Sequence, residues 1–171
     1  MFLVNRSNCD LLQASPCMSP DWVVYANTKN GIKIEYPKTW NYRLKDNPWD
    51  SFIVFFPRDD EQSGARVAIS VELLSELITL KDYIESFKKE VSNYSEESRF
   101  IEQKEVLLLH NKAYKVLYVF EREDKKIKKM AIITIQSKRA YIIHYEAEFN
   151  IFLKYESVVK AMANSLELAN P

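Results

Sequence analysis

Two residues of the sequence, His144 and Glu146, have the types and the spacing of an acid–base pair. They lie in an apolar run that predicts a β-strand over 140–148, so both side chains are expected on one face of that strand. An imidazole beside a carboxylate exchanges protons near neutral pH, and a pocket holding the pair would suit a small-molecule binder or a hydrolase. The simpler interpretation is a sheet histidine whose hydrogen bonds are satisfied. We favour that interpretation and predict no catalytic residue.

The sequence holds little further material for catalysis or for binding metals. Its two glycines, Gly31 and Gly64, are too few for the glycine-rich loops that bind nucleotide phosphates and for the Gly-x-Ser-x-Gly turn of serine hydrolases. The second histidine, His110, falls in a predicted turn and is expected to be exposed. Two histidines and two cysteines cannot form a four-ligand zinc site unless all four converge. We therefore predict no cofactor and no metal site.

An acidic run, Asp59 to Glu61, has the oxygen ligands that calcium prefers. It lacks the ligand spacing of an EF-hand loop, so a solvated turn is the favoured interpretation. An aromatic stripe also invites a ligand, because Tyr114, Val116, Tyr118 and Phe120 alternate along one predicted strand. The alternation is that of a strand face, so core packing is favoured there over a ligand groove.

A dense basic cluster lies at and just beyond a predicted hairpin turn. It has four lysines within five positions: Lys125, Lys126, Lys128 and Lys129. Three acidic residues within 121–124 stand beside it, so a solvated turn of mixed charge is the alternative interpretation. Charges on a protruding hairpin steer the approach of a charged partner without disturbing the core. We predict that these lysines are candidate residues for binding a protein partner.

Length and composition favour one soluble domain. The 171 residues are 47% hydrophobic, which is enough for a sizeable core, and the 24 basic and 24 acidic residues cancel. A neutral chain does not suggest a nucleic-acid partner. We expect an irregular leader at 1–20, holding Cys9 and Cys17, and a single domain at 21–169. The cysteines either pair or remain free thiols, and no segment has the length of a signal peptide core or a membrane span.

The elements that must position these candidates follow from the periodicity of apolar residues. Alternating runs predict β-strands at 22–25, 32–36, 42–45, 52–56, 67–73, 100–109, 113–123, 127–137 and 140–148. A 3.6-residue period predicts helices near 79–94 and 151–167, the first with Thr79 as its N-cap. The last four strands are joined by connections too short for a parallel crossover. The sheet is therefore expected to be antiparallel, with six to eight strands.

Four blocks of the sequence resemble the PsbP family. The first runs from Tyr25 to Trp40, where GIKIEYPKTW is similar to the family's opening Gly-Φ-x-Φ-x-Tyr-Pro-x-x-Trp run, Φ being apolar. The others follow in the family's order: TLKDY at 79–83, KAY at 112–114, and AYIIHY at 140–145 followed by MANSL at 162–166. The resemblance covers about residues 22–168.

The resemblance implies an α+β fold, an α-β-α sandwich with a central antiparallel sheet of the Mog/PsbP-like kind. It also implies a non-catalytic accessory protein that binds a protein partner, such as a subunit of a membrane complex. Members of this group are typically exported, lumenal or associated with a membrane surface, although residues 1–20 show no export signal. The alternative is the small-molecule binder or hydrolase with its pocket near His144.

Overall fold

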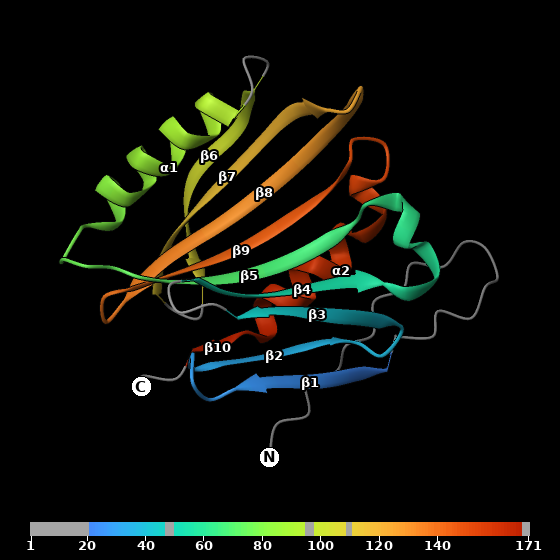
Figure 1. The fold of residues 1–171 in the computed structure, drawn as a ribbon, viewed down its shortest axis with the longest axis horizontal. Coiled ribbons are helices and arrows are strands. Elements are labelled where there is room, and N and C mark those ends of the chain that lie inside the picture. Colours follow the sequence, from blue (N-terminus) through green and yellow to red (C-terminus); the bar gives the residue numbers. More distant parts are fainter. Residues whose placement is uncertain (1–20, 47–49, 95–97, 109–110, 169–171) are drawn as a thin grey trace.

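The computed structural model describes residues 21–46, 50–94, 98–108 and 111–168. Over these residues the chain forms ten β-strands, two α-helices and one 3₁₀ helix (Figure 1). In chain order they are β1 (Trp22–Asn27), β2 (Ile32–Pro37), β3 (Trp40–Asp46), β4 (Asp50–Pro57), η1 (Arg58–Ser63), β5 (Arg66–Leu73), α1 (Leu80–Tyr94), β6 (Arg99–Leu108), β7 (Asn111–Arg122), β8 (Lys125–Gln136), β9 (Arg139–Glu148), α2 (Phe152–Ser165) and β10 (Glu167–Leu168).

The strands form two antiparallel sheets. The larger has seven strands in the order β3-β4-β5-β9-β8-β7-β6, and the smaller has the order β1-β2-β10. The expected antiparallel pairing is confirmed, because each strand pair in both sheets runs antiparallel. Strand β9 lies between β5 and β8, although β5 is far from it in the sequence. The strands of the two halves of the chain therefore form one sheet.

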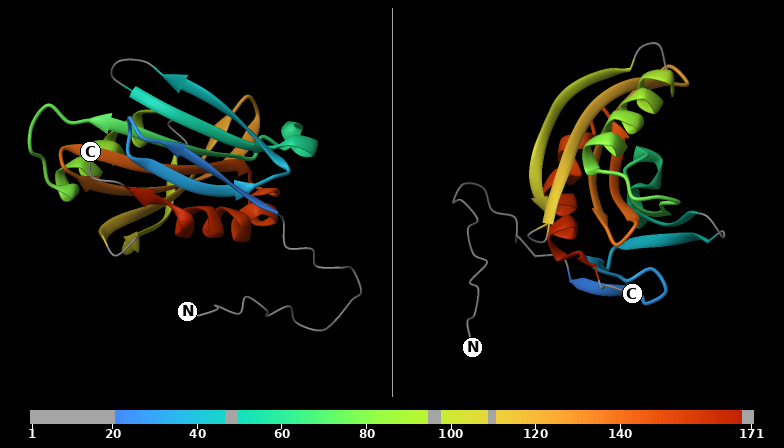
Figure 2. Two further views of the ribbon diagram at one scale, coloured as in Figure 1. Left: turned by 90° about the horizontal axis from the view of Figure 1, so that it is seen from below. Right: turned by 90° about the vertical axis from the view of Figure 1, so that its left-hand side faces the viewer.

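The central strands of the large sheet are buried on both faces, as their two-sided apolar character predicted. In β9, Tyr141 and Ile143 belong to the core that contains α2, whereas the alternate residue Ile142 belongs to the core under α1. A strand whose successive side chains all face apolar neighbours must lie between two layers. Figure 2 shows α1 in green and α2 in red on opposite sides of the orange strands.

The α-β-α sandwich is not confirmed in that simple form, because the first hairpin does not join the central sheet. It pairs instead with the short strand β10, which follows α2, through Ile32 opposite Leu168. Ile32 and Ile34 are buried in the same core as α2 and the large sheet. What the structure shows is a mainly β fold of antiparallel sheets with few helices. Of the helices in the described ranges, none combines the length and the apolar character that a membrane-spanning helix needs.

The start of α1 follows the sequence prediction. The Thr79 hydroxyl oxygen accepts a hydrogen bond from the backbone N–H of Asp82 at 3.1 Å, and the same hydroxyl donates to the Asp82 carboxylate at 2.6 Å. The bond to the N–H satisfies one of the orphan donors of the first turn.

Thr79→Ala is expected to lower the free energy of unfolding by about 1 kcal/mol, because the N-cap oxygen is lost. Urea denaturation of the two proteins measures the difference. Thr79→Ser is the matched control, since it keeps the capping oxygen, and it should stay within about 0.5 kcal/mol of the parent. Equal stability of the alanine and serine variants would contradict the cap.

Candidate functional site

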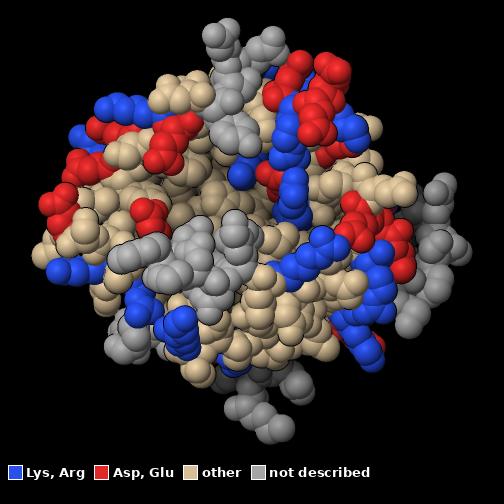
Figure 3. Space-filling model, in the orientation of Figure 1, with Lys and Arg blue, Asp and Glu red and all other residues tan. Residues whose placement is uncertain are grey.

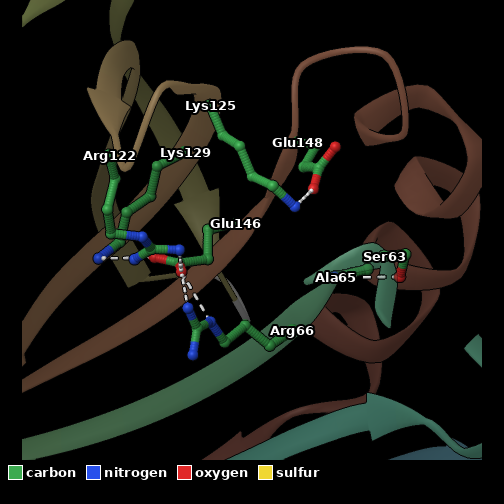
Figure 4. Close-up of polar contacts among 8 residues, drawn as sticks. All are labelled: Ser63, Ala65, Arg66, Arg122, Lys125, Lys129, Glu146 and Glu148. Atoms are coloured by element: carbon green, nitrogen blue, oxygen red, sulfur yellow. Dashed lines mark hydrogen bonds and ion pairs between the residues drawn. The ribbon is translucent and has the colours of Figure 1, made fainter. Parts of the chain in front are cut away.

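The described chain gathers three cationic side chains around one buried carboxylate, that of Glu146 on β9. The sheet register places two of them, since Arg66 of β5 and Lys129 of β8 lie directly opposite Glu146 on the two neighbouring strands. The third, Arg122, comes from β7. Figure 4 shows Arg122 and Lys129 approaching the carboxylate from one side and Arg66 from the other. We call these four residues the Glu146 cluster.

The contacts within the Glu146 cluster are short. Glu146 Oε1 accepts hydrogen bonds from Nε of Arg66 at 2.6 Å and from a guanidinium nitrogen of Arg122 at 3.1 Å. Its Oε2 lies 3.5 Å from Nζ of Lys129. Glu146 is only 8% exposed, so these bonds form in a place where water does little to screen charge.

Burial and charge act in opposite directions on the cluster. Burial alone would raise the pKa of Glu146, but Lys129, Arg66 and Arg122 together hold this pKa below its usual range. Burial lowers the pKa of Lys129, and the attraction of Glu146 opposes this only in part. Three cations around one carboxylate leave an excess of positive charge at this place.

His144 lies two residues before Glu146 and on the same face of β9, as its spacing predicted. Its ring packs 6.4 Å from that of Phe87 on α1. Within the described residues its Nδ1 is buried and has no hydrogen-bond partner. The favoured sequence interpretation, a histidine with all its hydrogen bonds satisfied, is therefore wrong at this atom. Burial first, and then the positive charge of Lys129, lower the pKa of His144 to about 3, so the ring is neutral near pH 7.

A small cavity of about 190 Å³ lies between α1 and the sheet beside the Glu146 cluster. Its lining residues are Phe87, Glu90, Val91, Tyr118, Phe120, Arg122, Lys129, His144 and Glu146. None of these carries a hydroxyl or thiol of the kind that serine or cysteine hydrolases activate. A neutral histidine with so low a pKa is also a poor base at neutral pH. The cavity therefore combines aromatic walls with charged groups that could hold a ligand.

The aromatic stripe of β7 packs as the sequence predicted. Val116, Tyr118 and Phe120 are buried in one apolar cluster with Val91 of α1. Tyr118 and Phe120 nevertheless also form a wall of the small cavity, so the core and ligand interpretations both describe these side chains. A larger hollow of about 770 Å³ lies farther along α1. Tyr114 and Thr79 line it together with aliphatic residues and with charged residues of both signs: Lys81, Glu85, Lys88, Glu105 and Lys112.

The four candidate lysines do not form one patch, because the alternation of β8 divides them between two faces. Lys129 lies in the Glu146 cluster, and Lys125 is paired with Glu148. Lys126 and Lys128 point the other way and lie over the ring of Phe149, at 4.9 and 5.8 Å from its centroid. The sequence prediction treated the four lysines as one charged surface, whereas they lie on two faces of β8.

The tip of the hairpin itself is mixed in charge. Glu123 and Asp124 form the two-residue turn, with φ of 52° and 60°, and both are exposed. At the upper right of Figure 3, over the tip of the β7–β8 hairpin, acidic and basic side chains lie side by side. Basic side chains lie on both flanks of the hairpin, Lys126 and Lys128 near Phe149 and Arg122 and Lys129 in the Glu146 cluster.

Sequence reasoning missed the apolar part of this flank. Phe149 is 46% exposed and Leu153 is 69% exposed. The segment is held against the hairpin, because the backbone N–H of Phe149 donates to the carbonyl of Lys126 at 2.9 Å. The sequence feature that could have indicated it is an aromatic residue, Phe149, directly after the predicted strand 140–148. We call Lys126, Lys128 and Phe149, together with the exposed Leu153 in the first turn of α2, the Phe149 patch.

The remaining sequence candidates have structural roles or lie outside the described residues. Asp60 accepts hydrogen bonds from Lys154 and Tyr155, each at 2.6 Å, and these two bonds lower its pKa. The acidic run thus links η1 to α2, and no group of three potential metal ligands occurs in the described parts of the chain. His110, Cys9 and Cys17 lie outside the described residues.

Comparison with known proteins identifies a family and a fold. The family model of PsbP matches residues 20–168. No curated protein sequence matches the chain.

Solved structures share the fold at low sequence identity. Cyanobacterial PsbP (CyanoP) from Synechocystis sp. PCC 6803 is 16% identical, with a TM-score of 0.67 over 93% of this chain and 99% of that one. A protein of unknown function and putative regulator from Pseudomonas aeruginosa is 11% identical, with a TM-score of 0.59 over 88% of this chain and 98% of that one. LpqN of Mycobacterium tuberculosis, involved in cell envelope biogenesis, is 8% identical, with a TM-score of 0.55 over 88% and 91%.

Proposed function

The chain belongs to the PsbP family, and from that premise we propose that it is a non-catalytic accessory domain that binds a protein partner. The partner we propose is a subunit of a membrane complex that presents an acidic surface. This protein would meet it outside the cytoplasm or at a membrane surface, as the resemblance to the PsbP family implies. The α-β-α sandwich that the family resemblance implies would hold the docking loops rigidly in place.

The observation that carries the proposal is the Phe149 patch. Aromatic side chains are enriched at the centres of protein interfaces and charged side chains lie at their rims, so an exposed Phe149 flanked by lysines suits a docking surface. Lys126 and Lys128 lie against the Phe149 ring, so the ring is already oriented before a partner arrives. The patch also lies on a hairpin and a helix start, which can be reached without opening either core.

Partner binding is tested first by site-specific photo-crosslinking in cells of the source organism. A crosslinking residue at Leu153 should capture a defined partner, whereas the same residue at Leu73 should not capture it. Leu73 is the matched control because it is 65% exposed, close to the 69% of Leu153, and lies on β5, outside the Phe149 patch. Equal capture from both positions would contradict a docking surface at this patch.

The double variant Lys125→Glu/Lys126→Glu should then weaken binding of the identified partner about tenfold at low salt and reduce the salt dependence of its affinity, because charges at an interface rim steer association. Thermal stability should change little, since both lysines are exposed. Lys160→Glu, on the exposed side of α2, serves as the control. A double variant that binds as the parent does at every salt concentration would show that the hairpin is only a solvated turn.

A second candidate function, binding of a small molecule near His144, is favoured by a separate observation. The cavity beside the Glu146 cluster joins aromatic walls to charged groups, which is the usual composition of a ligand site. The hydrolase form of this candidate is not favoured, because the described lining holds no serine, threonine or cysteine beside His144.

A further inference from the structure

We propose that the cavity beside the Glu146 cluster binds a small aromatic monocarboxylate. This site lies under α1, on the face of the sheet opposite to Phe149 and α2, and is independent of the protein-binding role proposed above. Three observations carry it: the balance of charge, the shape and lining of the cavity, and a buried polar atom without a partner.

The balance of charge calls for one further negative charge. The cluster and the cavity lining together contain three cations, Arg66, Arg122 and Lys129, and two carboxylates, Glu90 and Glu146. Among the described residues, the carboxylate that pairs with these cations is that of Glu146, whose exposed fraction is small. Lys129 is the least exposed of the three cations and shares Glu146 with both arginines, so a ligand with one negative charge would give this poorly solvated group a counterion of its own. A dianion such as phosphate would bring more negative charge than the one excess positive charge can balance.

The shape of the cavity suits a single aromatic ring. Phe87 of α1 forms one wall, and Tyr118 and Phe120 of β7 form another, so a flat ring would find offset and edge contacts on both sides. The volume of about 190 Å³ is smaller than the roughly 300–1,000 Å³ of sites for drug-sized molecules. A ligand of about one ring with a short acidic group is therefore the size that fits.

The polar groups of the lining would orient such a ligand. Arg122 and Lys129 lie where a carboxylate could accept charge-assisted hydrogen bonds from both. Arg122 is also within cation–π distance of the Phe120 ring, 5.9 Å from its centroid, so the charged and aromatic parts of the site adjoin. His144 contributes a neutral imidazole whose buried Nδ1 lacks a hydrogen-bond partner within the described chain.

Benzoate titrated into the full chain at pH 7 tests the proposal, with binding followed by calorimetry and by amide chemical shifts. One molecule should bind per chain and shift the amides of α1, β7 and β9. Arg122→Gln and Lys129→Met should each weaken benzoate binding about tenfold or more, because each removes a charge-assisted contact. Lys125→Met is the matched control, since this exposed lysine follows the same turn and does not line the cavity, and it should bind benzoate as the parent does.

Several results would overturn the proposal. Benzyl alcohol has the same ring without the charge, and binding as tight as that of benzoate would show that the cations play no part. Phosphate that binds more tightly than benzoate would show that the ring plays no part. Weakening by Lys88→Met, in the larger hollow, but not by Arg122→Gln would place the ligand elsewhere. Because Arg122 is partly exposed, its variant is expected to fold and keeps the test valid even if Lys129→Met does not fold.

Discussion

Replacing Glu146 by glutamine is expected to lower the free energy of unfolding by about 3 kcal/mol. The substitution keeps the shape of the side chain and removes its charge, so Arg66, Arg122 and Lys129 lose their common counterion. Breaking a buried ion pair by removing one partner typically costs about 3–5 kcal/mol, because the remaining charge is left in a poorly solvated place. The lower end of that range applies here, since the two arginines are partly exposed and water can solvate them.

Urea denaturation of the parent and of Glu146→Gln measures this difference. Glu148→Gln is the matched control, because Glu148 lies two residues further on the same face of β9 and its ion pair with Lys125 is more exposed. Glu148→Gln should lower the free energy of unfolding by less than about 1 kcal/mol.

The double variant Glu146→Gln/Lys129→Met tests the cause. It should recover about 1 kcal/mol or more relative to Glu146→Gln, since Lys129 is the least exposed of the three cations. If Glu146→Gln costs no more than Glu148→Gln, the carboxylate is not the counterion that holds the cluster together.

Lowering the pH from 7 to 5 is expected to lower the free energy of unfolding by about 2 kcal/mol through His144 alone. Burial holds the pKa of this histidine at about 3 in the folded state, against its ordinary value of 6.5 in the unfolded chain. Between these two values the unfolded chain binds a proton that the folded chain does not. Stability therefore falls as the pH falls through 6.5 and continues to fall until the pH nears 3. Glu102, whose pKa is lowered to about 2 by hydrogen bonds from Lys104 and Lys115, adds to this loss chiefly below pH 5, where its carboxyl in the unfolded chain, with an ordinary pKa of 4.5, begins to bind a proton.

The chain offers a matched pair of variants for this measurement, since it has only two histidines. The free energy of unfolding is measured at pH 7, 6 and 5 for the parent, His144→Gln and His110→Gln. His144→Gln should remove most of the dependence between pH 7 and 5, whatever its stability at pH 7, and His110→Gln should retain it. Loss of the dependence in His110→Gln instead would show that the buried ring is not the group responsible.

The two effects have a common origin in the place where β5, β9 and β8 lie side by side. Glu146 and His144 alternate with Tyr145 and Ile143, so one face of β9 carries polar groups while the other fills the α2 core. A purely apolar face would pack more simply at this position, and buried polar groups of this kind are common at ligand sites. The benzoate experiment and the two stability experiments therefore examine the same residues by independent measurements.

Most of the secondary structure could be predicted from the sequence, because it depends on local patterns. The two-residue alternation of apolar side chains predicted nine of the strands, and the helix starting after Thr79 began where its capping residue placed it. Short connections between the last four strands required antiparallel pairing, and this too was confirmed. The spacing of His144 and Glu146 correctly placed both on one face. β10 was missed, since a strand of two residues has no period to detect.

The site itself depended on the tertiary structure. Arg66 and Glu146 are 80 residues apart, and nothing local to either indicates that β5 will pair with β9 in the register that sets them opposite each other. That register results from burying both faces of the large sheet at once, which is a property of the whole chain. The alternation of side chains that predicted β8 also places Lys129 on the face with the cavity and Lys126 on the opposite face, beside Phe149. The sequence by itself determined which segments are strands and which charges they carry, whereas only the packed sheet decided which of those charges share a face, because strand neighbours are selected by burial over the entire fold.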